Sequence, residues 1–203
     1  CANAKRKNRC GPTQGVLSAH ILLSNELLDF VNAADGLRRE AALILVVPER
    51  EEETSFVDEI RQLGCDFIFG IDAGGDSLAP SALSGPEGRD KLMLRLLRQV
   101  GVPLHHVVVA PGCDGEATAE ALAEAMSHEA SLSRYRGCCS LEPLYPDLQA
   151  VAARLTPERT PRIMLSAAAR LAADAGETMT VERGIWPEIP LAWLKHGFVF
   201  GDD

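Results

Sequence analysis

The chain has 203 residues, which is enough for one well-packed α/β core and not clearly for two. Hydrophobic residues make up 46% of it, as in a globular protein, and no apolar run approaches the roughly 18 residues that cross a membrane as a helix. The net charge of −9 argues against nucleic acid as the main partner, because phosphates would be repelled. We therefore expect one α/β domain over residues 1–203, without a nucleic-acid or membrane partner.

The first residues differ from the rest of the chain in charge. Residues 1–12 contain no acid, and their charged side chains are Lys5, Arg6, Lys7 and Arg9. This composition predicts a basic, flexible N-terminus. Because the sequence begins at Cys1 rather than Met, we also expect a chain that is processed or truncated at this end.

The six cysteines are scattered without a CxxC pair, so the spacing of a zinc site is absent. Cys138 and Cys139 are adjacent, which is compatible with a redox-active pair or with two reduced structural thiols. The pattern favours reduced thiols and a cytoplasmic protein.

The predicted elements alternate between helices and apolar strands. Thr13 can cap a helix over residues 15–33, and the continuous apolar run of residues 42–47 is typical of a strand covered on both faces. Further helices are predicted over residues 55–63, 89–100 and 117–126, and further strands over residues 67–71 and 105–110. This alternation predicts a three-layer, mostly parallel, doubly wound sheet of the Rossmann-like class.

The last third of the chain has a different pattern. Segments rich in Ala and Leu predict helices over residues 143–155 and 161–173. Short strands are predicted at residues 179–182 and 198–200, antiparallel at the sheet edge. We therefore expect a helical C-terminal third that packs on the sheet.

Acids and glycines follow two of the predicted strands in the same way. One strand ends in Asp72-Ala-Gly-Gly-Asp76, and another ends in Gly112-Cys-Asp114-Gly115-Glu116. Strands of a parallel sheet open at the same edge, and neighbouring strands lie about 5 Å apart. The carboxylates of Asp72, Asp76, Asp114 and Glu116 can then converge on one ligand.

These residue types suit a ligand that carries hydroxyl groups or phosphate. Asp72 and Asp76 can bind hydroxyls or Mg²⁺, and Asp76, Asp114 or Glu116 can act in catalysis as a general base. The predicted cradle for the ligand consists of Gly74, Gly75, Gly112 and Gly115. The alternatives are ordinary: Asp114 can be a helix N-cap, and the acids of residues 72–76 can bond local amides in a tight turn.

The long loop of residues 77–88 precedes a helix and can cover the site. Glu87 and Asp90, with Arg89, are therefore predicted to reach a ligand, although Asp90 can equally cap the following helix. His105 and His106 begin a strand, so we expect them at the opposite edge from the acids and outside the site.

Three segments resemble domain-of-unknown-function family 1152. They are residues 69–78, which contain Asp72-Ala-Gly-Gly-Asp76, residues 90–94, which begin with Asp90, and residues 110–116, Ala-Pro-Gly-Cys-Asp-Gly-Glu. The resemblance extends from about Ala41 to the C-terminus. It implies a Rossmann-like fold and no established activity. Members usually open with a Gly-rich turn after the first strand, which the basic start of this chain lacks.

Together these observations predict a Rossmann-like protein that binds a phosphorylated or hydroxyl-rich, nucleotide-like small molecule, with Mg²⁺ as a compatible cofactor. If the protein is an enzyme, we expect a transferase or hydrolase. The alternative is a non-catalytic subunit of a homo-oligomer or larger complex, which keeps the fold without the chemistry.

Overall fold

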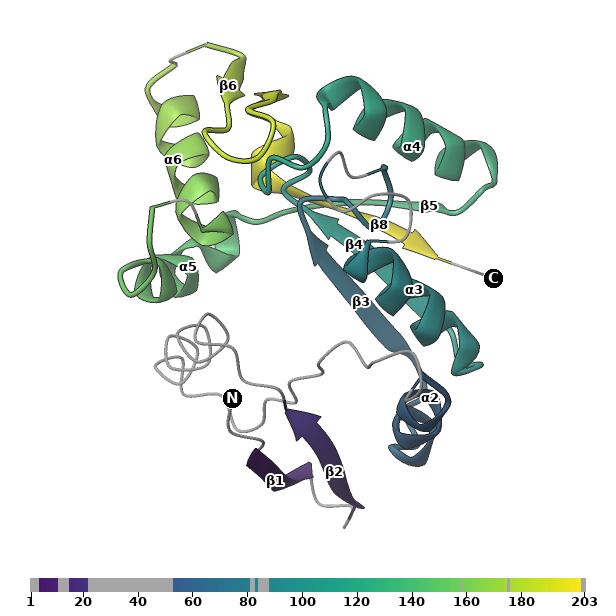
Figure 1. Cartoon of the computed structure of the whole chain (residues 1–203). Helices are drawn as coiled ribbons and strands as arrows, with labels where there is room; N and C mark the ends of the chain where they lie inside the picture. The colour runs from purple at the N-terminus through teal and green to yellow at the C-terminus, as the bar shows by residue number, and fades with distance from the viewer. Residues whose placement is uncertain are drawn as a thin grey trace.

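A computed structural model of the chain describes residues 4–10, 15–21, 53–80, 83, 88–157, 159–174 and 176–201 (Figure 1). The strand predicted at residues 42–47 lies outside the described residues, as does most of the helix predicted at 15–33. No helix within the described part is long and apolar enough to cross a membrane.

The N-terminal strands form a hairpin. β1 (Ala4–Cys10) pairs antiparallel with β2 (Gly15–Ile21), so that Cys10 lies opposite Gly15. Two predictions of secondary structure are therefore wrong: residues 4–10 form a strand rather than a loop, and residues 15–21 form a strand rather than the start of a helix. Apolar and polar residues alternate from Leu17 to Ile21, which suits a strand as well as the expected helical stripe, and pairing with a neighbouring strand decides between the two.

The main sheet has four described strands in the order β3-β4-β8-β5. Their bounds are β3 Ile68–Ala73, β4 Leu104–Val109, β5 Tyr135–Ser140 and β8 His196–Gly201. β3 and β4 are parallel, whereas β8 runs antiparallel to both β4 and β5. The described sheet is therefore mixed rather than mostly parallel, and the fold is of the mixed α/β class.

Two features of this sheet differ from the prediction. β8 is antiparallel as expected, but it lies between β4 and β5 rather than at the edge. β5 was not predicted, because its sequence Tyr-Arg-Gly-Cys-Cys-Ser contains no apolar run. β5 is a strand because its main chain pairs with β8, and the pattern of its side chains does not indicate this pairing.

Five α-helices are described, and each overlaps a predicted one. They are α2 Glu53–Gln62, α3 Arg89–Gln99, α4 Ala119–Ser131, α5 Tyr145–Ala152 and α6 Thr160–Ala172. The C-terminal third is less helical than predicted, since α6 is followed by β6 (Thr178–Thr180), β7 (Glu188–Pro190) and β8. The 3₁₀ turns η3 (Glu142–Leu144) and η4 (Trp193–Lys195) complete this part.

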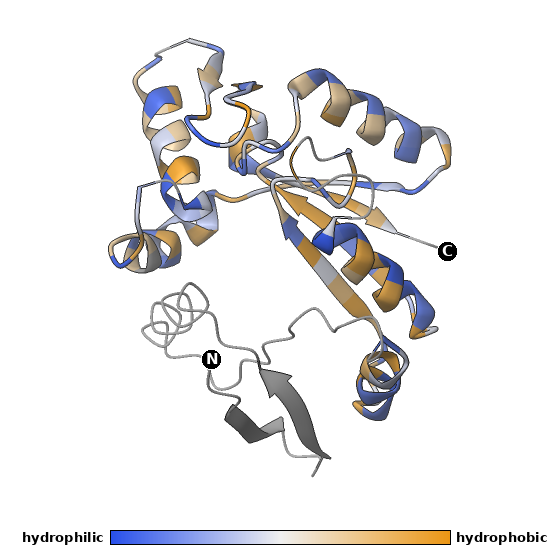
Figure 2. Ribbon diagram, in the orientation of Figure 1, coloured by the Kyte–Doolittle hydropathy of each residue, from blue (hydrophilic) through white to orange (hydrophobic). Residues whose placement is uncertain are grey.

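The core has two parts that meet at the sheet. One joins α2, α3 and the start of β4 through Val57, Ile60, Leu94, Leu96, Leu97, Val100 and Leu104. The other joins α4, α6 and the last loops through Leu122, Leu141, Ile163, Met164, Ile189, Leu191 and Leu194. Figure 2 shows hydrophobic residues along the strands between them. Since each buried large side chain contributes about 1.5–3 kcal/mol, these clusters fix the helices and loops against the two ends of β3 and β4.

Candidate functional site

The chain turns back on itself directly after β3. Asp72, in β3, is only 6% exposed, and Asp76, in the turn, is 8% exposed. The main-chain N–H of Ser77 donates to Asp72 Oδ2 over 3.1 Å, and the Ser77 hydroxyl donates to the same oxygen. Leu78 N and Ala79 N both donate to Gly75 O, which closes the turn. The turn therefore buries both acids against the end of the strand.

The turn after β4 packs against the first one. Ala73 lies opposite Val109 in the register, and Gly112 N donates to Gly74 O over 2.6 Å. The predicted adjacency of the two strand ends is therefore confirmed. Gly74 has a φ of +127°, and a Cβ at this position would collide with the Asp114 carboxylate, so only glycine fits here.

Three carboxylates meet beside these turns. Asp72, Asp76 and Asp90, the second residue of α3, each offer an oxygen within 4.8 Å of the others. Asp114 is not part of this cluster, and its Oδ1 accepts a hydrogen bond from Glu116 N over 3.1 Å. Asp114 therefore makes a local hydrogen bond of the kind predicted for an N-cap, but the N-cap residue of α4 is Thr118.

The remaining predicted site residues have different positions. Gly74, Gly75, Gly112 and Gly115 are buried, but they pack against the protein and are not among the residues that line the cavity described below. Their role as a ligand cradle stays a prediction. Glu87 lies outside the described residues.

Burial raises the proton affinity of the acids. Burial, followed by the charges of Asp72 and Asp90, raises the pKa of Asp76 to about 8. Burial raises the pKa of Asp114 to about 6, against the opposing hydrogen bond from Glu116 N. Burial also raises the pKa of Asp72, although the hydrogen bonds from Ser77 oppose it. Burial and mutual repulsion therefore disfavour the simultaneous ionisation of these carboxyl groups.

His106 belongs to this region, contrary to the prediction. Its Nε2 lies 2.7 Å from the Ser77 hydroxyl, and its side chain is 4% exposed. His106 lies opposite Gly70, on the same face as Asp72, and the turn after β3 returns Ser77 along that face. Along β4, the buried residues Leu104, His106 and Val108 alternate with less buried ones. Because every second residue of a strand faces the same side, the sequence could have placed His106 on the buried face with Leu104 and Val108.

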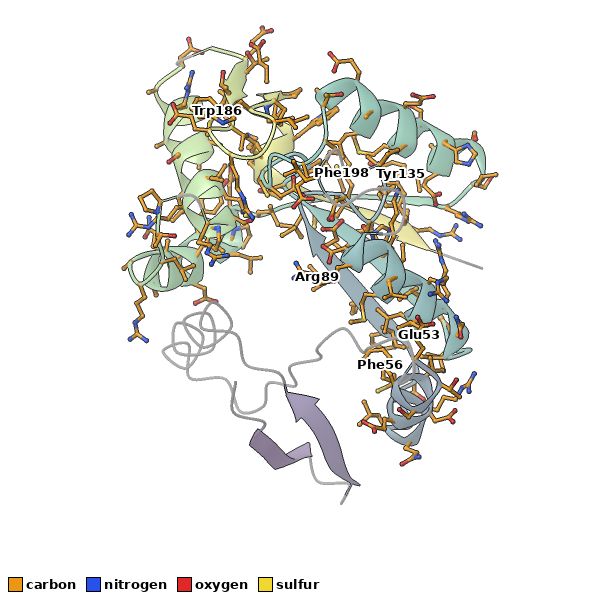
Figure 3. The ribbon with its side chains drawn as sticks, in the orientation of Figure 1. Glu53, Phe56, Arg89, Tyr135, Trp186 and Phe198 are labelled. Carbon is orange, nitrogen blue, oxygen red and sulfur yellow. The ribbon has the colours of Figure 1, made fainter. Side chains whose placement is uncertain are left out.

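A cavity of about 830 Å³ opens at this edge of the sheet. One wall carries the acids Asp72, Asp76, Asp90, Asp114 and Glu116. Another comes from the α5–α6 connection and the start of α6, with Arg154, Arg159 and Thr160, and Arg183 also lines the cavity. Arg89 extends from the start of α3 on the side of α5 and α6 (Figure 3).

Arg89 was predicted to reach a ligand, but the other basic residues of this cavity were missed in the sequence. Arg154 fell at the end of the helix predicted over residues 143–155, and Arg159 fell in the connection before the next helix. The packing of α5 on α6, which includes a hydrogen bond of 2.7 Å from Arg162 Nε to Ala152 O, sets the position of that connection. Sequence spacing alone does not show that this connection reaches the end of the sheet.

Comparison with known proteins gives one family. No curated protein and no solved structure matches the chain. The family model matches residues 23–179, so the similarity begins before Ala41 and ends before the C-terminus, in contrast to the expected extent. The matched part contains both strand-end turns and the three clustered acids. The chain therefore belongs to the family described as protein of unknown function (DUF1152).

Proposed function

We propose that the protein binds a phosphorylated or hydroxyl-rich, nucleotide-like small molecule in this cavity, in the cytoplasm. The observation that carries the proposal is the pairing of an acidic wall at the ends of β3 and β4 with arginines around the start of α6. The volume of about 830 Å³ lies within the range of cavities that hold drug-sized ligands.

The arginine side of the cavity suits a phosphate group. Guanidinium groups bind phosphate oxygens in a bidentate manner, and the N-terminus of a helix adds N–H donors and a partial positive charge. α6 has no acid in its first turn, and Arg159 is its N-cap residue without a side-chain capping bond. These features support an anionic group of the ligand between Arg154, Arg159 and Arg183.

The acidic side suits the hydroxyl groups of a sugar or polyol. Carboxylates accept hydrogen bonds from such hydroxyls, as in proteins that hold a ribose at the carboxyl end of a strand. The unit β3–α3–β4 has parallel strands joined by a helix, and it supports a Rossmann-like arrangement for the complete sheet. In that arrangement the ligand occupies the edge where Asp72 and Asp114 lie.

A catalytic version of the proposal uses the perturbed acids. A general base works best when its pKa lies near the working pH, and the pKa values of about 8 for Asp76 and about 6 for Asp114 satisfy this. Both side chains, and that of Glu116, line the cavity. The corresponding activity is transfer or hydrolysis at a phosphorylated or nucleotide-like substrate.

The test is a thermal-shift screen with nucleotides and sugar phosphates, run with EDTA and again with Mg²⁺. We expect a ligand that raises the midpoint for the wild type and raises it much less for Arg159→Gln. Arg170→Gln, in the exposed last turn of α6, is the matched control and should respond like the wild type. No response to any compound, or equal responses of both variants, contradicts the proposal.

A second candidate function is that of a non-catalytic subunit in a larger assembly. It is favoured by the exposed apolar side chains of Phe67, Phe69 and Ile71, which are 53%, 56% and 69% exposed. These side chains lie in β3 and directly before it, and large exposed apolar side chains that are grouped together often mark a protein interface. Light scattering on the purified protein tests it: a monomer whose mass is unchanged by Phe69→Ser contradicts a homo-oligomer through this face.

A further inference from the structure

Three carboxyl groups converge at the end of β3. Asp72 and Asp76 are buried and Asp90 is half-buried, and each offers an oxygen within 4.8 Å of the others. Asp90 makes an ion pair with Arg89 over 3.4 Å, and the Arg89 side chain is 77% exposed. Such an exposed pair contributes little, so it offsets only a small part of the repulsion between the three carboxyl groups.

A separate observation indicates where a ligand atom belongs. Asp72 Oδ1 is buried and has no hydrogen-bond partner among the described residues. Its other oxygen, Oδ2, is occupied by the N–H and hydroxyl of Ser77. Leaving a buried carboxylate oxygen unpaired costs about 1–3 kcal/mol or more, which makes such atoms rare without a functional reason.

We propose that Asp72, through Oδ1, together with Asp76 and Asp90 holds one hard divalent cation of the Mg²⁺, Mn²⁺ or Ca²⁺ type. Oxygen ligands from carboxylates are those that these ions prefer, and none of the three residues offers the sulfur or imidazole that zinc favours. The site goes beyond the proposed function, because it requires the ion alone and no particular organic ligand.

The spacing of the oxygens agrees with such an ion. Ligand oxygens on opposite sides of the ion lie about 4.0–4.2 Å apart around Mg²⁺ and about 4.6–5.2 Å apart around Ca²⁺. The three oxygens of the structure lie within 4.8 Å of one another, which is close enough for one ion of this type to contact all of them. Because the cluster borders the cavity, water or a ligand can complete the coordination.

Ser77 and His106 orient the first of these ligands. Ser77 holds Asp72 Oδ2, and His106 Nε2 lies 2.7 Å from the Ser77 hydroxyl. This chain of contacts leaves Oδ1 as the oxygen that remains for the ion. Hydrogen-bonded partners behind a ligand are a general feature of metal sites, and their removal weakens binding.

The experiment is calorimetric titration of protein stripped with EDTA, using MgCl₂, MnCl₂ and CaCl₂ separately and no nucleotide. We expect one ion per chain for the wild type and affinity at least about tenfold weaker for Asp76→Asn and for Asp90→Asn. Circular dichroism checks that each variant is folded. Asp76 lies in the turn after β3 and Asp90 lies in α3, so the second variant still tests the site if the first one misfolds.

Asp58→Asn is the matched control. Asp58 lies in α2, is exposed and does not border the cavity, and its ion pair is with Arg61. Retained ion binding in this variant supports coordination by the cluster. An equal loss in Asp58→Asn, or no binding of any of the three ions by the wild type, overturns the site. Nucleotide binding in EDTA is a separate result, which tests the proposed function alone.

Discussion

The two turns that follow β3 and β4 have similar sequences and different environments. Both combine glycines with acids, but Asp72 keeps one oxygen without a partner and joins a cluster of three carboxylates. Asp114 instead accepts a bond from Glu116 N. Main-chain contacts support the second turn further, since Ile185 N donates to Gly115 O over 2.9 Å.

This difference teaches that an acidic strand end is not by itself a ligand site. The turn after β4 acts largely as a scaffold, because its glycines and its acid pack against neighbouring segments. In the turn after β3, Asp72 Oδ1 has no hydrogen-bond partner among the described residues, and burial together with the neighbouring acids raises the pKa of Asp76. Variants of each turn can therefore separate structural support from ligand binding.

The largest effect is expected at the contact between the turns. Gly74→Ala places a methyl group in the Asp114 carboxylate and forces a φ of +127° on a residue that rarely adopts it. We expect a loss of about 3 kcal/mol or more in the free energy of unfolding, measured with urea. Gly64→Ala, at φ +63° with no atom within 4 Å, should lose only about 1 kcal/mol. Equal losses would show that the two turns do not depend on this contact.

The next largest effect is a pH-dependent change in the free energy of unfolding, measured in EDTA, which distinguishes Asp76 from Asp114. A carboxyl whose pKa is raised on folding stabilises the protein below its unfolded pKa, and this stability is lost as the pH rises through the folded pKa. The pKa of Asp76 is about 8, so Asp76→Asn should be increasingly stabilising from pH 4 to 8, by on the order of 2 kcal/mol at the upper end.

Asp114→Asn should reach its full gain in stability at a lower pH than Asp76→Asn. Its pKa of about 6 confines the change to the interval between about pH 4 and pH 6, with a gain on the order of 1 kcal/mol. Urea unfolding at a series of pH values compares the two variants. A stabilisation of Asp76→Asn that does not change with pH would contradict the burial of an ionisable group in the cluster.

Ser77→Ala should have a smaller effect on stability and a distinct effect on the ion. The change leaves the Ser77 N–H bond to Asp72 Oδ2 intact but removes the hydroxyl that links Asp72 to His106. We expect a loss of about 1–2 kcal/mol in urea and a several-fold weaker affinity for Mn²⁺. Unchanged Mn²⁺ affinity would mean that the hydroxyl does not position Asp72.

The smallest effect is expected at Thr118, which follows the turn after β4. Thr118 caps α4, and its Oγ1 accepts a hydrogen bond from Ala121 N over 3.2 Å. Thr118→Ala should cost about 1 kcal/mol in urea unfolding, as is usual for an N-cap, and leave the affinity for divalent ions unchanged. A weaker ion affinity in this variant would show that the turn after β4 also shapes the ion site.

Part of the site followed from local sequence. Apolar runs that end in acids predicted β3, β4 and the position of their turns, and the parallel register then made these turns neighbours. Asp90 was a candidate because it begins a helix after a long loop. His106, Arg154, Arg159 and Arg183 were missed, since they join the site from parts of the chain that lie far from its acids in the sequence.

Strong periodicity and long apolar runs predicted the five described helices, β3, β4, and the acids and glycines that follow these two strands. Only the tertiary structure decided the order of the sheet, the central place of the antiparallel β8, and the existence of β5. Packing between distant segments also brings the cluster of Asp72, Asp76 and Asp90 into the same cavity as Arg154 and Arg159 of the α5–α6 connection. The physical reason is that periodicity reports which face of a local segment is buried, whereas strand pairing and the meeting of distant charges depend on packing between segments.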